Sequence, residues 1–178
     1  GHEASIGLSV DGSKLLIYSS QQDPNGNIYL SQLDGDKWSI PVPFVEINTK
    51  ASEVHACFNV DGYSVYFDSD RKGGYGGFDI YKIVQLPNGA WSLPINLGSN
   101  INSAYDETAP FIHPDGENLY FASNGHDNMG GYDIFQSKLD SVGLWSNPKN
   151  IGYPINSTGD DLFYVTSVDG KRAYYASE

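Results

Sequence analysis

The sequence repeats itself about every 54 residues, and this constrains the fold more than any other feature. Four Asp-Gly pairs, spaced 50, 54 and 54 residues apart, begin at Asp11, Asp61, Asp115 and Asp169. Each pair is followed by a short apolar and aromatic run: LLIYSS, VYFDSD, LYFASN and AYYASE. Eight positions before each pair stands an acidic residue: Glu3, Glu53, Glu107 and Asp161. This constant phase indicates that the chain is built from copies of one structural unit.

The second half of each unit repeats as well. An Ile-aromatic pair recurs at 28–29, 80–81 and 134–135. A Trp-Ser pair with Pro three positions after the Trp begins at Trp38, Trp91 and Trp145. Each unit closes with Ile-Asn-Ser/Thr, at 47–49, 101–103 and 155–157. The repeat units therefore extend over 3–52, 53–106, 107–160 and, incompletely, 161–178.

Each complete unit contains four strand candidates separated by turn signals; in the third unit they are TAPFIH, NLYFAS, YDIFQSKL and LWSNP. Four short strands at this period are typical of a β-propeller blade, whereas helical and leucine-rich repeats are shorter. The Asp-Gly pair predicts a hairpin between the first two strands, and the Pro after each Trp predicts an edge strand. We predict an all-β fold, a β-propeller of four-stranded antiparallel blades. Three blades and the inner half of a fourth are expected, as part of a propeller of about five to eight blades.

The amino-acid composition argues against nucleic acid as a partner. Asp and Glu number 22 against 10 Lys and Arg, a formal net charge of −12, which would repel a nucleic-acid backbone. No run approaches the roughly 18 apolar residues of a membrane-spanning helix. The single cysteine, Cys57, cannot form an internal disulfide, and its neighbours VHACFNV predict a small buried apolar residue.

The patterns D-G-x-x-L-Y-F-x-S, G-G-x-D-I-Y and W-S-x-P-x-N-L-G resemble the TolB-like, WD-repeat-like propeller blades of bacterial envelope proteins. The match is fullest in VYFDSDRKGGYGGFDIY with WSLPINLG, and in LYFASNGHDNMGGYDIF with WSNPKNIG. The version with long glycine loops is similar to propellers of Bacteroidetes proteins with an OmpA-like peptidoglycan-binding domain, among them PorE-type type IX secretion components. The resemblance implies a periplasmic, outer-membrane-associated scaffold that binds envelope protein partners and performs no chemistry. Peptidoglycan would be reached only through a domain outside this chain.

The stretch GGYGGFDIYK, Gly73 to Lys82, looks like a phosphate-binding loop but does not fit one. Asp79 occupies the place of the last glycine in G-x-G-x-x-G, no Lys-Ser/Thr follows, and the next segment is a predicted strand rather than a helix. We predict instead that the glycines supply positive φ angles in a long loop. Asp79 and Asp133 would accept loop N–H groups as structural anchors. The first unit differs, with Asn27 at this position.

Candidates for metal binding and catalysis are few. Ca²⁺ could be held by Asp70 with Asp79, or by Asp127, Asn128 and Asp133, although neither loop has the ligand order of an EF-hand. The histidines stand singly, which disfavours zinc; they are His2, His55, His113 and His126. No G-x-S-x-G motif occurs, so we predict no catalytic residue and no cofactor. A Ser, His and Asp that are distant in sequence could still meet in the folded chain.

The repeated acidic residues allow two interpretations. Glu3, Glu53, Glu107 and Asp161 each open an innermost strand, so they would form a ring that could attract cations or a basic peptide to the mouth of a channel. Alternatively, each carboxylate hydrogen-bonds the Asn-Ser/Thr turn upstream and builds the blade. A specific site usually breaks a repeat, which favours the second interpretation.

The long loops 69–78 and 123–132 should share one end of the propeller with the links between blades. Their residues differ between copies while the frame stays the same, which is typical of a binding surface. We predict a partner-binding face made of Arg71, Lys72, Tyr75, His126, Asp127, Asn128 and Met129. The predicted function is a non-catalytic scaffold for protein–protein interaction. The alternative is a propeller enzyme, or a module that binds a sugar or small ligand in the axial channel.

Overall fold

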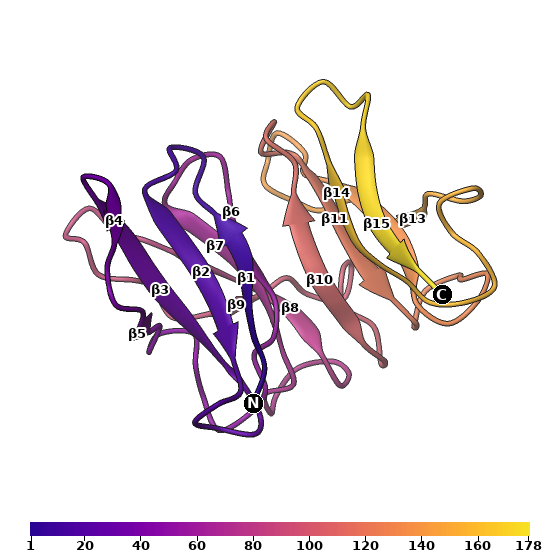
Figure 1. Cartoon of the computed structure of the whole chain (residues 1–178). Helices are drawn as coiled ribbons and strands as arrows, with labels where there is room; N and C mark the ends of the chain where they lie inside the picture. The colour runs from indigo at the N-terminus through magenta and orange to yellow at the C-terminus, as the bar shows by residue number, and fades with distance from the viewer.

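The computed structural model describes all 178 residues and contains fifteen strands and no helix, so no helix in it could span a membrane. The strands form four antiparallel sheets that follow one another in chain order, from the indigo N-terminal sheet to the yellow C-terminal one (Figure 1). The all-β architecture of propeller blades predicted from the repeat is confirmed.

The first sheet has the order β1-β2-β3-β4, with β5 also paired to β3. The strands are β1 (Glu3–Leu8), β2 (Lys14–Ser19), β3 (Asn27–Asp34), β4 (Lys37–Trp38) and β5 (Val42–Pro43). The second sheet has the order β6-β7-β8-β9, and the third β10-β11-β12-β13. The strands of the second sheet are β6 (Ala56–Phe58), β7 (Ser64–Ser69), β8 (Asp79–Val84) and β9 (Ile95–Asn96). Those of the third are β10 (Glu107–Ile112), β11 (Asn118–Ser123), β12 (Asp133–Lys138) and β13 (Lys149–Asn150).

The fourth sheet contains only β14 (Asp161–Thr166) and β15 (Ala173–Ser177). They pair from Asp161 opposite Ser177 to Thr166 opposite Ala173. They occupy the place of the two inner strands of a blade, so the chain holds three blades and the inner half of a fourth.

The Asp-Gly pairs form the hairpin turns between the first two strands of each blade. In the second blade the Asp61 carboxylate accepts hydrogen bonds from the backbone N–H of Tyr63 and Ser64, each at 2.8 Å. Gly62 adopts φ +69° there, a left-handed conformation that glycine reaches at little cost. The turn residues therefore form the hairpin that their sequence predicts.

The outermost strand of each blade is short because of its proline. Trp91 and Trp145 make single bridges to Gln85 and Leu139, and pairing resumes only after the proline, in β9 and β13. Proline has no N–H to donate to the strand ladder. The two tryptophans also join neighbouring blades: Trp91 packs edge-on against Phe44 and Trp145 against Tyr66.

The hydrophobic core lies between successive sheets. One cluster of ten buried residues, including Leu16, Ile28 and Phe67, joins the first and second blades. A second cluster of seven, including Tyr66, Leu119 and Phe121, joins the second and third blades. Burial of this apolar surface holds the blades together. The innermost strands β1, β6, β10 and β14 are thereby brought side by side.

Candidate functional site

The repeated acidic residues are built into the blade frame. Glu53 and Glu107 are 0% exposed. Glu107 accepts hydrogen bonds from Ser103 N at 2.6 Å, Ser103 Oγ at 2.7 Å and Ser123 Oγ at 2.7 Å. Glu53 makes the equivalent contacts with Thr49 and Ser69. These carboxylates thus tie the link between blades to the end of the second strand.

The other two acidic residues differ in burial. Asp161 is also 0% exposed and accepts a hydrogen bond from Ser157 N at 2.6 Å. Glu3 is exposed, and only Ser19 Oγ, at 3.3 Å, donates to it. Three of the four carboxylates are therefore closed off from solvent, so they do not form an open ring at a channel mouth. The observed contacts favour the blade-building interpretation.

Two residues of the predicted partner-binding face turn inward. Arg71 donates from Nη2 to the carbonyl of Ile47 at 2.7 Å and to Glu53 Oε1 at 3.1 Å. Its guanidinium also lies 4.9 Å from the ring centres of both Phe67 and Tyr81.

His126 takes the same place in the third blade. Its Nε2 lies 2.8 Å from the carbonyl of Ile101 and 3.9 Å from Glu107 Oε1. Its ring contacts Phe121 and Phe135. Arg71 and His126 each cover the end of a blade and bind the link before it, so these two side chains are engaged by the frame rather than free on a surface.

The remaining residues of that face are exposed: Lys72, Tyr75, Asp127, Asn128 and Met129. We call these five the loop face. The loops that carry them lie against the link that follows, since Gly77 N donates to the Tyr105 carbonyl at 2.8 Å and Gly131 N to the Gly159 carbonyl at 3.0 Å. Two long loops are therefore held firmly at one end of the blades while their outer side chains stay accessible.

Asp79 and Asp133 lie at the base of these loops, as β8 and β12 begin. Asp79 accepts from Tyr75 N at 2.6 Å, Gly76 N at 3.1 Å and Asn96 Nδ2 at 2.9 Å. Asp133 accepts from Met129 N and from Asn150 Nδ2. Each carboxylate joins its loop to the outermost strand of the same blade.

The reason for the loop glycines differs from the one that the sequence suggested. Among the glycines of the loops 69–78 and 123–132, only Gly73 has a positive φ, +94°. A Cβ on Gly74 would lie 1.9 Å from Asp79 Oδ2, one on Gly76 1.8 Å from the Tyr105 carbonyl, and one on Gly77 2.2 Å from Asp106 Oδ1. Glycine is required mainly because carboxylates and backbone approach too closely for any side chain.

The carboxylates considered for Ca²⁺ are separately engaged. Asp70 accepts a hydrogen bond from Ser52 N at 2.7 Å, whereas Asp79 serves its own loop. In the third blade, Asn128 donates to loop carbonyls while Asp127 is exposed. No group of three or more His, Cys, Asp or Glu side chains is arranged to hold a metal ion.

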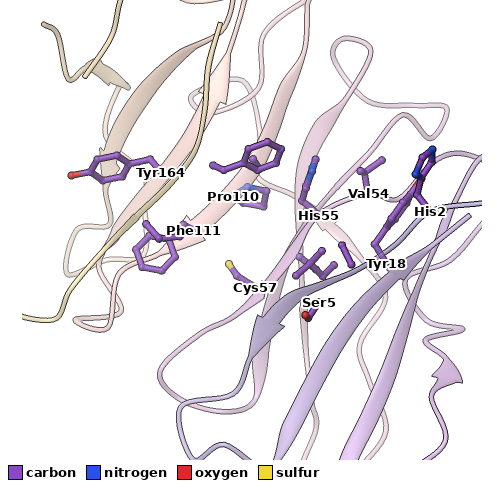
Figure 2. Close-up of a pocket in the computed structure, with 15 residues that line it drawn as sticks. His2, Ser5, Tyr18, Val54, His55, Cys57, Pro110, Phe111 and Tyr164 are labelled. Atoms are coloured by element: carbon purple, nitrogen blue, oxygen red, sulfur yellow. The ribbon is translucent and has the colours of Figure 1, made fainter. Parts of the chain in front are cut away.

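A pocket of about 460 Å³ lies along the innermost strands, and we call it the axial pocket. Figure 2 shows Phe111, Pro110 and Tyr164 on one side and Tyr18 and His2 on the other, with His55 and Cys57 between them. Eleven of its fifteen lining residues are hydrophobic.

Three of the four innermost strands that line this pocket contain an irregularity in their pairing. The register shifts in β1, β10 and β14, and the bulged residues Ala109 and Phe163 adopt φ +49° and +59°. Both stand two positions after the acidic residue of their blade, and the equivalent residues of the other blades are Ser5 and His55. All four line the pocket. β-Bulges are over-represented next to active sites, where they re-aim side chains.

His55 is held by a buried carboxylate. Its Nδ1 lies 2.6 Å from Asp68 Oδ2, and Asp68 is 0% exposed. Asp68 also accepts from the backbone N–H of Val54, His55 and Ala109. The hydroxyl of Thr108, on the next blade, donates to the same carboxylate.

The surroundings of both residues favour the charged form of this pair. Burial opposes the imidazolium form, but the Asp68 carboxylate and its hydrogen bond more than offset that, so the pKa of His55 is raised. Burial likewise opposes the carboxylate, yet the charge of His55 and the hydrogen bonds from His55 and Thr108 hold the pKa of Asp68 below its ordinary value. The result is an oriented imidazole on the wall of a largely apolar pocket.

Sequence reasoning missed this pair, although a signal was present. The hairpin register pairs Ala56 with Phe67, and one further step sets His55 opposite Asp68. Both residues break the repeat. Ser5, Ala109 and Phe163 stand at the position of His55, and Tyr18, Ala122 and Ala176 at that of Asp68.

Cys57 lies two residues from His55 and lines the same pocket. It is half-buried and packs against the second core cluster, which is less burial than its sequence neighbours suggested. Burial raises the pKa of its thiol to about 12, so the thiolate is scarce at neutral pH. Its role is that of a packing residue.

No protein-family model and no curated protein sequence matches this chain. Solved structures do match. TolB from Acinetobacter baumannii gives a TM-score of 0.62 at 18% identity, covering 98% of this chain and 37% of that protein. A protein described as a TolB of Agrobacterium tumefaciens gives 0.62 at 21% identity, covering 100% of this chain and 59% of that one. The fold is that of a TolB-like β-propeller.

A protease of known structure matches this chain as well. The tricorn protease matches with a TM-score of 0.59 at 18% identity, covering 98% of this chain and 15% of that protein. The chain spans less than two thirds of the length of each of these three structures. Because one fold serves several activities, function has to be argued from the residues of this chain.

Proposed function

We propose that the chain is part of a non-catalytic propeller scaffold that binds protein partners in a periplasmic, outer-membrane-associated assembly. Type IX secretion or a peptidoglycan-linked complex would be such an assembly. The observation that carries the proposal is that the loop residues at one end of the blades fall into two groups. Arg71, His126, Asp79 and Asp133 are engaged internally, whereas the loop face is left exposed.

The loop face has the chemistry of a protein-binding surface. Tyr75 and Met129 are 53% and 51% exposed, and they are accompanied by Lys72, Asp127 and Asn128. Tyrosine and methionine contribute large contact areas at protein interfaces, and neighbouring charges add specificity. The rigid hold on the loops lowers the entropy lost on binding. Contacts of this kind need no cofactor.

Site-specific photo-crosslinking tests the proposal. A photo-reactive phenylalanine analogue is placed at Tyr75 or Met129, and as a matched control at Tyr63, which is 62% exposed in the Asp-Gly turn at the opposite end. In envelope preparations of a bacterium that encodes the chain, discrete crosslinks should form from Tyr75 and Met129 but not from Tyr63. Unlabelled wild-type chain should compete, and a chain with Lys72→Ala and Asp127→Ala should compete less. Equal crosslinking from both ends, or none from the loop face, would overturn the proposal.

One observation favours the second candidate, a small-ligand site in the axial channel. His55 lies on the wall of the axial pocket, Asp68 holds it from behind, and both residues differ from their counterparts in the other blades. A binding site and a scaffold are compatible on one propeller, since the loop face and the axial pocket are made of different residues.

A further inference from the structure

The axial pocket is unusual for this chain because it lacks fixed charge. The protein carries a formal net charge of −12, yet none of the fifteen lining residues is Asp, Glu, Lys or Arg. The groups there that can become positive are His2 and His55. A cation would therefore find no carboxylate on the pocket wall, whereas an anion would meet an imidazolium.

His55 can contact a ligand through one ring atom, Nε2. Its Nδ1 is occupied by Asp68, with Thr108 Oγ1 at 3.1 Å, and this leaves Nε2 without a hydrogen-bond partner in the protein. The side chain is 23% exposed and its ring lies 5.1 Å from that of Phe163. A carboxylate that holds Nδ1 orients the ring and favours its protonated form, in which Nε2 donates a charge-assisted hydrogen bond.

The rest of the wall selects the body of the ligand. Val54, Ala109, Pro110, Phe111 and Phe163 offer apolar contact around His55. A volume of about 460 Å³ is within the usual range for small-molecule sites. A sugar or a phosphate would need several converging polar groups, and this wall offers few.

We propose that the axial pocket binds a small monocarboxylate with an apolar body, and that His55 recognises the carboxylate through Nε2. Asp68 acts as a positioning residue behind it. The proposal concerns a small acid in the channel, so it holds or fails independently of protein binding at the loop face.

Binding and protonation are linked in this site. The titratable groups that face His55 or share the pocket are Asp68 of β7, His2 and Tyr18 near β1 and β2, Cys57 of β6 and Tyr164 of β14. Within the pair, His55 is the group that changes charge as the pH rises, because the pKa of Asp68 is held below its ordinary value. The affinity for a carboxylate should therefore fall as the pH rises above the pKa of His55, with a limiting slope of about tenfold per pH unit.

Calorimetry with octanoate, octanol and octylamine tests the proposal in the wild-type chain. At pH 6 octanoate should bind at least tenfold more tightly than octanol, and octylamine should not bind. Raising the pH to 8.5 should lower the affinity for octanoate and leave the affinity for octanol unchanged. His55→Gln should reduce the affinity for octanoate tenfold or more, whereas His113→Gln, a matched change outside the pocket at an Asp-Gly turn, should not alter it.

A second measurement does not depend on a variant that folds. NMR titration of the His55 ring in the wild-type chain should show its midpoint moving to higher pH when octanoate is added, while His113 stays in place. Octanol that binds as well as octanoate, an unchanged His55 midpoint, or no octanoate binding at millimolar concentration would each overturn the proposal.

Discussion

Arg71 donates a hydrogen bond to Glu53 across 3.1 Å, and this contact joins the glycine-rich loop of the second blade to the link from the first blade. Glu53 is 0% exposed. The same arginine reaches the Ile47 carbonyl and covers two aromatic rings. A residue that the loop sequence marks as variable therefore serves the blade frame.

Removing Arg71 should destabilise the fold. Arg71→Met leaves the buried Glu53 carboxylate without its cation, although Thr49 and Ser69 still donate to it. The free energy of unfolding in urea should fall by about 2 to 4 kcal/mol. Lys72→Met, next in the chain and exposed, should change it by less than about 0.5 kcal/mol. Equal effects of the two variants would contradict the assigned role of Arg71.

Stability should depend on pH through His55 and Asp68. The pKa of His55 is raised from 6.5 in the folded chain, so its stabilisation is full below 6.5 and is lost as the pH rises through the folded value. The pKa of Asp68 is lowered from 3.8, so its stabilisation is present above 3.8 and is lost as the pH falls through the lower value. The pair should therefore stabilise the fold most between pH 3.8 and pH 6.5.

Urea unfolding of the wild-type chain and of His55→Gln between pH 5 and 8.5 measures this effect. The wild-type advantage should be largest at pH 5 to 6 and should shrink toward pH 8.5. Taking the difference removes the contribution of the overall net charge, because both proteins share all other titrating groups. An advantage that grows with pH would show that the pair is not charged in the folded state.

We predict that the loop glycines are needed because other atoms approach them closely, rather than because of their backbone conformation. Gly76→Ala would place a Cβ 1.8 Å from the Tyr105 carbonyl, so the loop has to move away from the link. Amide hydrogen exchange should then accelerate at Gly77 and Phe78, whose N–H groups bond Tyr105 and Asp106 in the wild type. Lys72→Ala in the same loop serves as control. Unchanged protection of both amides in Gly76→Ala would contradict the packing described.

Much of the fold could be predicted because its signals are local and recur in each unit. The Asp-Gly turns, the strand runs after them and the proline of the outermost strand act within a few residues. The contacts of Asp79 and Asp133 are local as well, since each carboxylate accepts from N–H groups three or four residues upstream.

The site was harder to predict because its contacts cross between strands and blades. His55 meets Asp68 across a hairpin, and Asp68 then reaches Thr108 on the next blade. The sequence also does not show whether the side chain of a variable residue points outward or inward. It predicts that Arg71 and His126 belong to a partner-binding face, yet they contact the Ile47 and Ile101 carbonyls.

The central claim is that repeated polar residues build the blades, while the exposed residues of the loop face, which differ between copies, are free to bind. One comparison tests it directly: the free energy of unfolding in urea of Glu107→Gln against Asp127→Asn, the same chemical change at a buried repeated position and at the exposed loop face of one blade. Glu107→Gln should lose about 1 to 3 kcal/mol, because Ser103 and Ser123 lose a charged acceptor, and Asp127→Asn should stay within about 0.5 kcal/mol. Equal losses, or a larger loss for Asp127→Asn, would contradict the account.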